Sequence, residues 1–303
     1  MTDHPILVWI LSLNRDYTVT EYDQCHKVVQ ECIQHTSFPY QPKNPDSFRK
    51  IVTTLLPLLM MRHRRIPRAK WKDYTNNQGK HWIEQSPDGL PPEKYPYSMI
   101  GYHLTFSNSV CGMAMTQGER SKVVNIGFGV NQYAVPSQGT SVETYVESMS
   151  HKVSRLVTHP PRLSADLTQL KLTALELQSL QGQPEEVTLR RLCILLALKD
   201  SYIRALGQPL GFDYARLEFD VSNHKAWGDG KPLTGWEFRI FTASLGVARG
   251  SQLVSELYEC ACAFFRGTNE IKFVWHQTAR ELEGWVQFIN LDQMVKVLPK
   301  LSA

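Results

Sequence analysis

The chain has 303 residues, of which 42% are hydrophobic and 20% are charged, and its formal net charge is +4. This composition indicates a globular protein with a sizeable core, and so mild a charge argues against a nucleic-acid partner. The six cysteines have neither paired spacing nor a zinc-binding pattern, so we expect reduced thiols and a cytoplasmic protein.

The first part of the chain alternates short strands with helices. The apolar run at residues 6–13 is too short to span a membrane and lacks the features of a secretory signal, so it predicts a first strand. Helices are predicted over residues 22–35 and 45–65, and the second leads into a basic cluster between residues 62 and 72. That cluster is either a solvated helix end or a phosphate-binding rim. A turn at residues 78–80, a strand pair over residues 98–115 and a strand over 122–130 follow.

The second part of the chain begins with helical patterns. Helices are predicted over residues 142–157, 165–180 and 184–207. Residues 215–221 and 236–243 alternate at period two around an Asp229-Gly230 turn, which predicts an antiparallel pair. We expect a further helix over residues 246–266, strands at 271–275 and 285–290 that close the sheet, and a short helix from Leu291.

The helix predicted over residues 184–207 organises this second part. Acidic residues follow Pro184, and Gly207 ends the run, so both helix ends are signalled. Residues 189–198 are apolar on nearly every side, which predicts burial by several neighbours. Helical spacing then places Asp200 and Arg204 on one line. They are either a surface ion pair or part of a site.

Several segments resemble Sfp-type 4′-phosphopantetheinyl transferases, particularly the fungal ones. Residues 189–207 resemble the W-x-x-K-E-A-x-x-K segment of that family, and residues 215–219 its following strand. Residues 55–62 are similar to its basic helix, 79–80 to its G-K-P turn, 102–106 to its F-N-V-S-H, and 126–130 to its V-G-I-D-I. The resemblance covers roughly residues 55–285, in the family's order.

The resemblance implies an α/β (α+β) fold of two pseudo-symmetric halves, each a small, mostly antiparallel sheet with packed helices. We expect these halves to be residues 1–121 and 122–303, with coenzyme A bound in a cleft between them that the helix at 184–207 lines. An acyl or peptidyl carrier protein is the implied partner. We expect a monomer of secondary metabolism with neither a membrane nor a nucleic-acid partner.

The resemblance also implies roles for individual side chains. Asp200 is the expected metal ligand or base, and Lys199 lies beside it in the motif. The residues implied to contact coenzyme A, mainly through its phosphates, are Arg62, Arg64, Lys80, Thr105, Lys199 and Arg204.

Four functional positions of the family pattern differ here. The family holds magnesium with the Asp of G-I-D, an acidic residue two positions later and the Glu of K-E-A; here these are Gly129, Asn131 and Asp200. The His of V-S-H is Phe106. Since magnesium needs carboxylate ligands in a near-octahedral arrangement, the pattern predicts a largely lost metal site. Gly129→Asp with Asn131→Glu would then be expected to restore part of it.

Three functions remain open. The first is phosphopantetheine transfer from coenzyme A to a carrier-protein serine with the magnesium site largely lost. The second is metal-independent acid–base chemistry in the same cleft, such as isomerisation or cyclisation of an apolar metabolite, with Asp200 as acid or base and His103 and Tyr202 as partners. The third is non-catalytic binding of coenzyme A or of a carrier protein.

Overall fold

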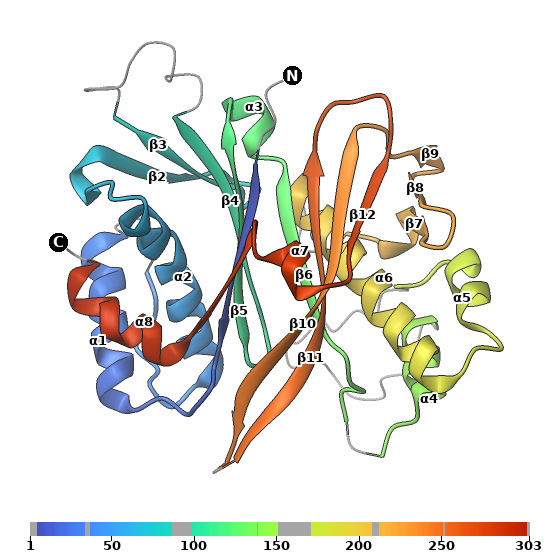
Figure 1. Ribbon diagram of the computed structural model, residues 1–303, viewed down its shortest axis with the longest axis horizontal. Helices are drawn as coiled ribbons and strands as arrows, with labels where there is room; N and C mark the ends of the chain where they lie inside the picture. The colour runs from blue at the N-terminus through green and yellow to red at the C-terminus, as the bar shows by residue number, and fades with distance from the viewer. Residues whose placement is uncertain are drawn as a thin grey trace, which may run out of the picture.

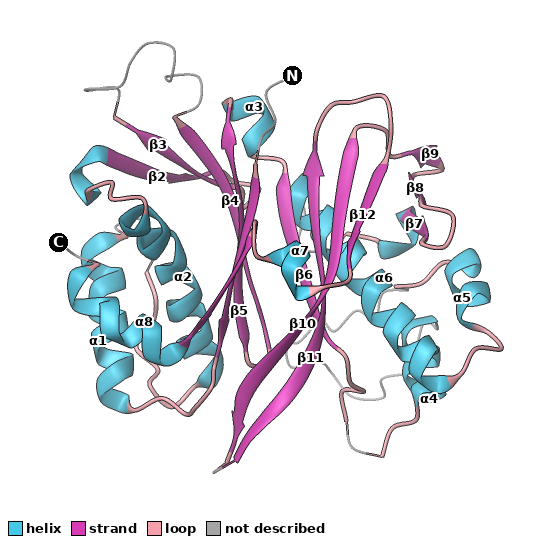
Figure 2. Ribbon diagram, viewed as in Figure 1, coloured by secondary structure: helices cyan, strands magenta, loops and turns pink. Residues whose placement is uncertain are grey.

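The computed structural model describes residues 5–33, 37–86, 98–137, 139–150, 171–207, 212–250 and 252–301. The chain forms two main sheets that pack against each other, with helices on their outer sides (Figures 1 and 2). The predicted mixed α/β (α+β) class is therefore confirmed. None of the helices in the described ranges is long and apolar enough to cross a membrane.

The first sheet has the strand order β13-β1-β5-β4-β3-β2, and all its neighbouring pairs are antiparallel except β1 with β13. Its strands are β1 (Ile6–Ser12), β2 (Trp71–Thr75), β3 (His81–Gln85), β4 (Met99–Ser107), β5 (Val110–Gly118) and β13 (Val286–Asn290). The helices α1 (Val19–Cys32), α2 (Pro45–His63) and α8 (Leu291–Val297) enclose a core with one face of this sheet.

The second sheet has the strand order β12-β10-β11-β6. Its strands are β6 (Ile126–Gln132), β10 (Trp236–Arg249), β11 (Gln252–Phe265) and β12 (Lys272–His276). The long helix α6 (Glu185–Leu206) packs on its outer face, next to α4 (Val142–Ser150), α5 (Ala174–Leu180) and the small sheet of β7 (Leu217–Asp220), β8 (Lys225–Gly228) and β9 (Lys231–Pro232). Short helices α3 (Arg120–Val123) and α7 (Ala279–Leu282) occupy two connections.

The inner faces of the two main sheets share one hydrophobic core. Ile10 and Ala114 of the first sheet pack there with Phe128, Phe241 and Cys262 of the second, and all five side chains are buried. The long helix contributes no described residue to this core and packs on the outer side of the second sheet, and its expected place along a cleft between the halves stays a prediction. Its C-terminal end nevertheless reaches the first half, because Gly207 lies against the side chain of Lys80.

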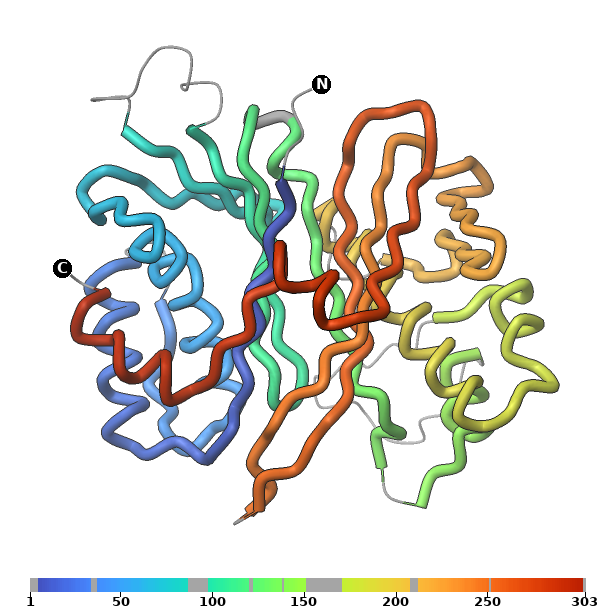
Figure 3. The backbone as a smooth tube through the Cα atoms, in the orientation of Figure 1, coloured from blue at the N-terminus to red at the C-terminus, as the bar shows by residue number. Residues whose placement is uncertain are grey.

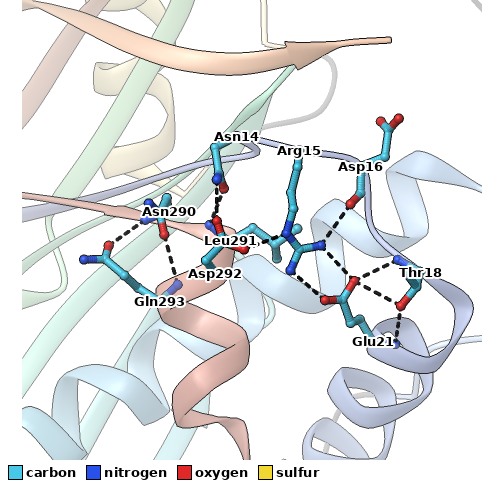
Figure 4. A network of polar contacts seen from close by, with 9 residues as sticks. All are labelled: Asn14, Arg15, Asp16, Thr18, Glu21, Asn290, Leu291, Asp292 and Gln293. Atoms are coloured by element: carbon cyan, nitrogen blue, oxygen red, sulfur yellow. Dashed lines mark hydrogen bonds and ion pairs between the residues drawn. The ribbon is translucent and has the colours of Figure 1, made fainter. Parts of the chain in front are cut away.

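The end of the chain returns to the first half. After β12 the backbone crosses back to form β13 and α8 beside β1 (Figure 3). Arg15 fixes this return by donating to Asp292 at 2.6 Å and to Glu21 at 2.6 Å, and Asn14 contacts both Leu291 and Asp292 (Figure 4). The division into residues 1–121 and 122–303 stays a prediction. In the structure, the chain after β12 returns from the second half to the first.

The ends of α6 follow the sequence signals. Glu185 and Glu186 lie in its first turn, and Gly207 adopts the left-handed conformation (φ 75°) that ends the helix. Pro184 is the residue before the first helical one. The predicted strand at 6–13, the helices at 22–35 and 45–65, the strand pair at 98–115 and the helix from Leu291 are confirmed within a few residues.

Two predictions about the second part of the chain are wrong. Residues 246–266 form no helix: they belong to β10 and β11, which turn at Gly250 (φ 62°). Residues 215–221 and 236–243 do not pair either, because β7 pairs with β8 whereas β10 pairs with β11 and β12.

The helices predicted at 142–157 and 165–180 lie partly outside the described residues, which exclude 151–170. Their described parts are α4 and α5.

Candidate functional site

Strand β6 and helix α6 approach each other closely through two glycines. A Cβ atom on Gly129 would lie 2.1 Å from the carbonyl oxygen of Ala197, and one on Gly127 would lie 2.0 Å from that of Ser201. Real Cβ atoms do not come this near to backbone. The glycines therefore let the backbone of α6 occupy the space that side chains of β6 would otherwise fill.

This packing bears on the magnesium site that the resemblance implies. Gly129 holds the position of the family's first carboxylate, and there is no room for one while Ala197 stays in place. Asn131, at the second position, has a buried side-chain Nδ2 without a partner among the described residues. No group of three or more His, Cys, Asp or Glu side chains in the described ranges could hold a metal ion. Gly129 therefore supplies no carboxylate at the first position, and Asn131 supplies an amide at the second.

The third family position, Asp200, is engaged by a tyrosine. The hydroxyl of Tyr214 donates to Asp200 Oδ1 at 2.6 Å. Burial, and then the charge of Asp200, raises the pKa of Tyr214, so this hydroxyl stays protonated and remains a donor. Burial also raises the pKa of Tyr145 on α4 to about 12, and Asp200 adds to that shift. The carboxylate thus accepts from the protonated phenol of Tyr214, and its charge also acts on that of Tyr145.

Lys199 points away from any open site. Its side chain is 0% exposed, and its Nζ forms an ion pair with Glu176 Oε2 at 2.7 Å, which is also 0% exposed. The same ammonium donates to the carbonyls of Lys171, Tyr214 and Leu217. Burial lowers the pKa of Lys199 and raises that of Glu176, and the charge of each opposes the shift of the other. The pair joins α5, α6 and the segment before β7.

Basic side chains gather where α6 meets the first half. Lys80 Nζ donates to Asn125 Oδ1 at 2.7 Å, just before β6, and burial lowers the pKa of Lys80. Arg204 is exposed near the end of α6. His103 Nδ1 accepts from the backbone N–H of Phe128 at 3.2 Å. Burial and then the charges of Arg204 and His81 hold the pKa of His103 well below its ordinary value, so His103 is a neutral acceptor.

Other predicted site residues lie in separate surroundings. Thr105 of β4 pairs with Gly112 and lies on the side of the sheet that faces Phe128, whereas Phe106 packs into the core beneath the helices of the first half. Arg62 donates to the carbonyl of Lys300. Arg64 donates to Gln117, and burial lowers its pKa.

Tyr202 is not a neighbour of Asp200. Its ring lies 4.6 Å from that of Trp236, within the core under the second sheet. The hydroxyl beside Asp200 comes instead from Tyr214, in the 3₁₀ turn at Tyr214–Arg216. Sequence reasoning missed this residue, because no spacing rule connects a tyrosine in a turn with a carboxylate on the preceding helix.

Comparisons with known proteins bear on the family of this chain. No family model matches the chain. A 4′-phosphopantetheinyl transferase, pptA, of Paxillus involutus is 30% identical over 238 residues, which are 77% of this chain and 81% of that protein. The chain therefore belongs to the 4′-phosphopantetheinyl transferase superfamily.

Proposed function

We propose that this chain binds coenzyme A where the two halves meet, and that it transfers the phosphopantetheine arm to a serine of an acyl or peptidyl carrier protein slowly and without the family's magnesium site. The family membership supports the reaction class. The proposal that transfer proceeds without the family's magnesium site rests on the contact between β6 and α6, because this contact leaves no room for a carboxylate at Gly129. The protein acts as a cytoplasmic monomer in this proposal.

Two basic side chains, Lys80 and Arg204, form the surface proposed to bind the phosphates of coenzyme A. Lys80 and Arg204 come from different halves and lie at the same end of α6, so a ligand held by both would span the boundary. Ammonium and guanidinium groups form charge-assisted hydrogen bonds with phosphate oxygens. Thr105 lies on the inner side of β4 and offers a neutral hydroxyl.

Lys199, Arg62 and Arg64 have no part in this proposal. The buried Lys199 already has a carboxylate and three carbonyls as acceptors. Arg62 and Arg64 each donate to a residue of the first half, Lys300 and Gln117 respectively. A phosphate contact from Lys199 would require its bonds to break, because an ammonium group has only three N–H donors.

The loss of the metal predicts a slow reaction. A bound cation stabilises the charge of a phosphoryl transition state by several kcal/mol, so its absence costs on the order of a thousandfold in rate. Lys80 and Arg204 offset part of this loss by neutralising phosphate charge. We therefore expect transfer that is measurable but does not respond to magnesium.

Mass spectrometry of apo carrier proteins tests the proposal. Acyl and peptidyl carrier proteins are incubated with coenzyme A and the protein, either with magnesium or with a chelator, and a gain of about 340 Da marks phosphopantetheine. We expect equal slow conversion in both conditions and none with Lys80→Ala. Fast conversion that stops with the chelator would contradict the proposal. Coenzyme A binding without conversion would leave the chain a non-catalytic binder.

A second candidate function rests on the Tyr214–Asp200 hydrogen bond. A carboxylate that accepts from a protonated phenol can act as a general base without a metal, as isomerisation or cyclisation of an apolar metabolite requires. His103 is less suited to join it than the sequence suggests, because Phe128 already occupies its Nδ1. Asp200→Asn and Tyr214→Phe would both abolish turnover of a metabolite found with the wild type, and unchanged turnover in both excludes this function.

A further inference from the structure

A basic cavity lies at the end of α2, in the first half. Its volume is about 410 Å³, within the usual range of small-molecule sites. Four basic side chains line it, Arg62, Arg65, Arg68 and Lys300, and none of its described lining residues is acidic. Apolar residues, among them Leu58, Ile66 and Leu301, form the rest of the wall.

The charge of this cavity is not balanced by its surroundings. None of the four cations is ion-paired with a residue in the described part of the chain. The C-terminal end of α2 offers only about half a negative elementary charge, which is far less than four cations carry. Arg62 uses one N–H on the carbonyl of Lys300, and Arg68 is held against the Trp71 ring at 4.1 Å by the carbonyls of Cys32 and Trp71. Arg65 and Lys300 are exposed and line the same cavity.

The backbone of Arg65 is unusual for an arginine. Arg65 has φ 58°, and the bonds Arg65 N–H to Arg62 carbonyl and Ile66 N–H to Met61 carbonyl form the motif that ends α2. Glycine normally holds this left-handed position, as Gly207 does at the end of α6. An arginine here costs conformational energy, and strained residues of this kind concentrate at ligand sites.

We propose that this cavity binds an anionic amphiphile, a phosphate monoester or carboxylate attached to a short apolar chain. The head group meets Arg65, Lys300 and the remaining N–H groups of Arg62, where guanidinium forks suit phosphate and carboxylate oxygens. The apolar chain packs on Leu58 and Ile66. This site is separate from the Lys80 and Arg204 surface proposed for coenzyme A, so it extends the protein's binding capacity beyond the proposed function.

Calorimetric titration with hexyl phosphate tests this site, with inorganic phosphate as the head group alone and hexyltrimethylammonium as the same chain with a positive charge. We expect one hexyl phosphate per chain, weaker binding of phosphate and no binding of the cation. Arg65→Asn tolerates the left-handed backbone and should weaken binding roughly tenfold, as should Lys300→Gln, since each removes a charge-assisted contact. Arg280→Gln removes an exposed cation elsewhere and should change nothing.

The same variants distinguish a lipid ligand from a free metabolite. They also distinguish this cavity from the surface proposed for coenzyme A. Sedimentation with phosphatidic acid vesicles that is lost in Arg65→Asn identifies a lipid head group, whereas hexyl phosphate binding without vesicle binding identifies a free metabolite. Lys80→Ala should weaken coenzyme A binding and leave hexyl phosphate binding intact. Competition between coenzyme A and hexyl phosphate, or equal hexyl phosphate affinity in wild type, Arg65→Asn and Lys300→Gln, would overturn the inference.

Discussion

A side chain at position 129 should destabilise the protein. In Gly129→Ala the new Cβ would stand 2.1 Å from the Ala197 oxygen and 3.0 Å from the Ser201 nitrogen. Ordinary contacts begin at 3.4 Å, so β6 and α6 must separate by more than about 1 Å. The obstacle is helix backbone, which cannot rotate away as a side chain can.

The expected cost follows from what α6 buries. Leu192, Leu195 and Leu198 are almost fully buried on this helix, so a shift of α6 disturbs the whole core beneath the second sheet. Overpacking a core by one methyl group typically costs about 1–3 kcal/mol, and contact with fixed backbone places Gly129→Ala at about 3 kcal/mol. Gly129→Asp should cost more, because it also buries a carboxylate.

Urea denaturation measures this cost. The matched control is Gly246→Ala in β10, where the nearest atom to the new Cβ is a Leu253 carbon at 3.5 Å, and we expect a change of at most about 0.5 kcal/mol there. The double change Gly129→Asp with Asn131→Glu, which the family pattern alone suggests as a restoration, should lower stability instead. A Gly129→Ala variant as stable as the control would refute the packing argument.

Two further predictions concern ion pairs. Hydrogen bonds from Arg15 lower the pKa of Glu21 and of Asp292 in the folded protein below the unfolded pKa values of 4.5 and 3.8. These two carboxylates therefore stabilise the fold at pH values above their unfolded pKa. This stabilisation is lost as pH falls through their lower pKa in the folded protein. The stability difference between wild type and Arg15→Gln, measured by urea midpoints, should therefore be constant near neutral pH and shrink in acid; a difference that persists in strong acid would contradict this. For the buried pair, Lys199→Met and Glu176→Gln should each cost about 3–5 kcal/mol, and the double variant should cost less than their sum. Additive losses in that mutant cycle would show that the two groups are not coupled.

The sequence predicts much of the fold, and its failures have physical causes. The α6 helix was predictable, because both of its ends carry local signals and its middle is uniformly apolar. Strand β11 was not, because Glu, Leu and Ala are frequent in it and favour a helix in isolation. Pairing with β10 on one side and β6 on the other overrides that preference.

The site was less predictable than the fold. The resemblance located Asp200 and the substituted positions Gly129 and Asn131, but composition and spacing say nothing about how near a helix comes to a strand. The structure shows that the backbone of α6 at Ala197 fills the space where a side chain at position 129 would lie. The Tyr214–Asp200 hydrogen bond likewise depends on where the chain turns after α6, which is a tertiary property.

We propose that coenzyme A binds here without a magnesium ion held by β6 and α6. Calorimetric titration of the protein with coenzyme A, first in excess magnesium and then in a chelator, tests it most directly. We expect the same dissociation constant in both conditions, reduced affinity in Lys80→Ala, and no effect of magnesium in either protein. An affinity about tenfold higher with magnesium, lost in Asp200→Asn, would contradict it.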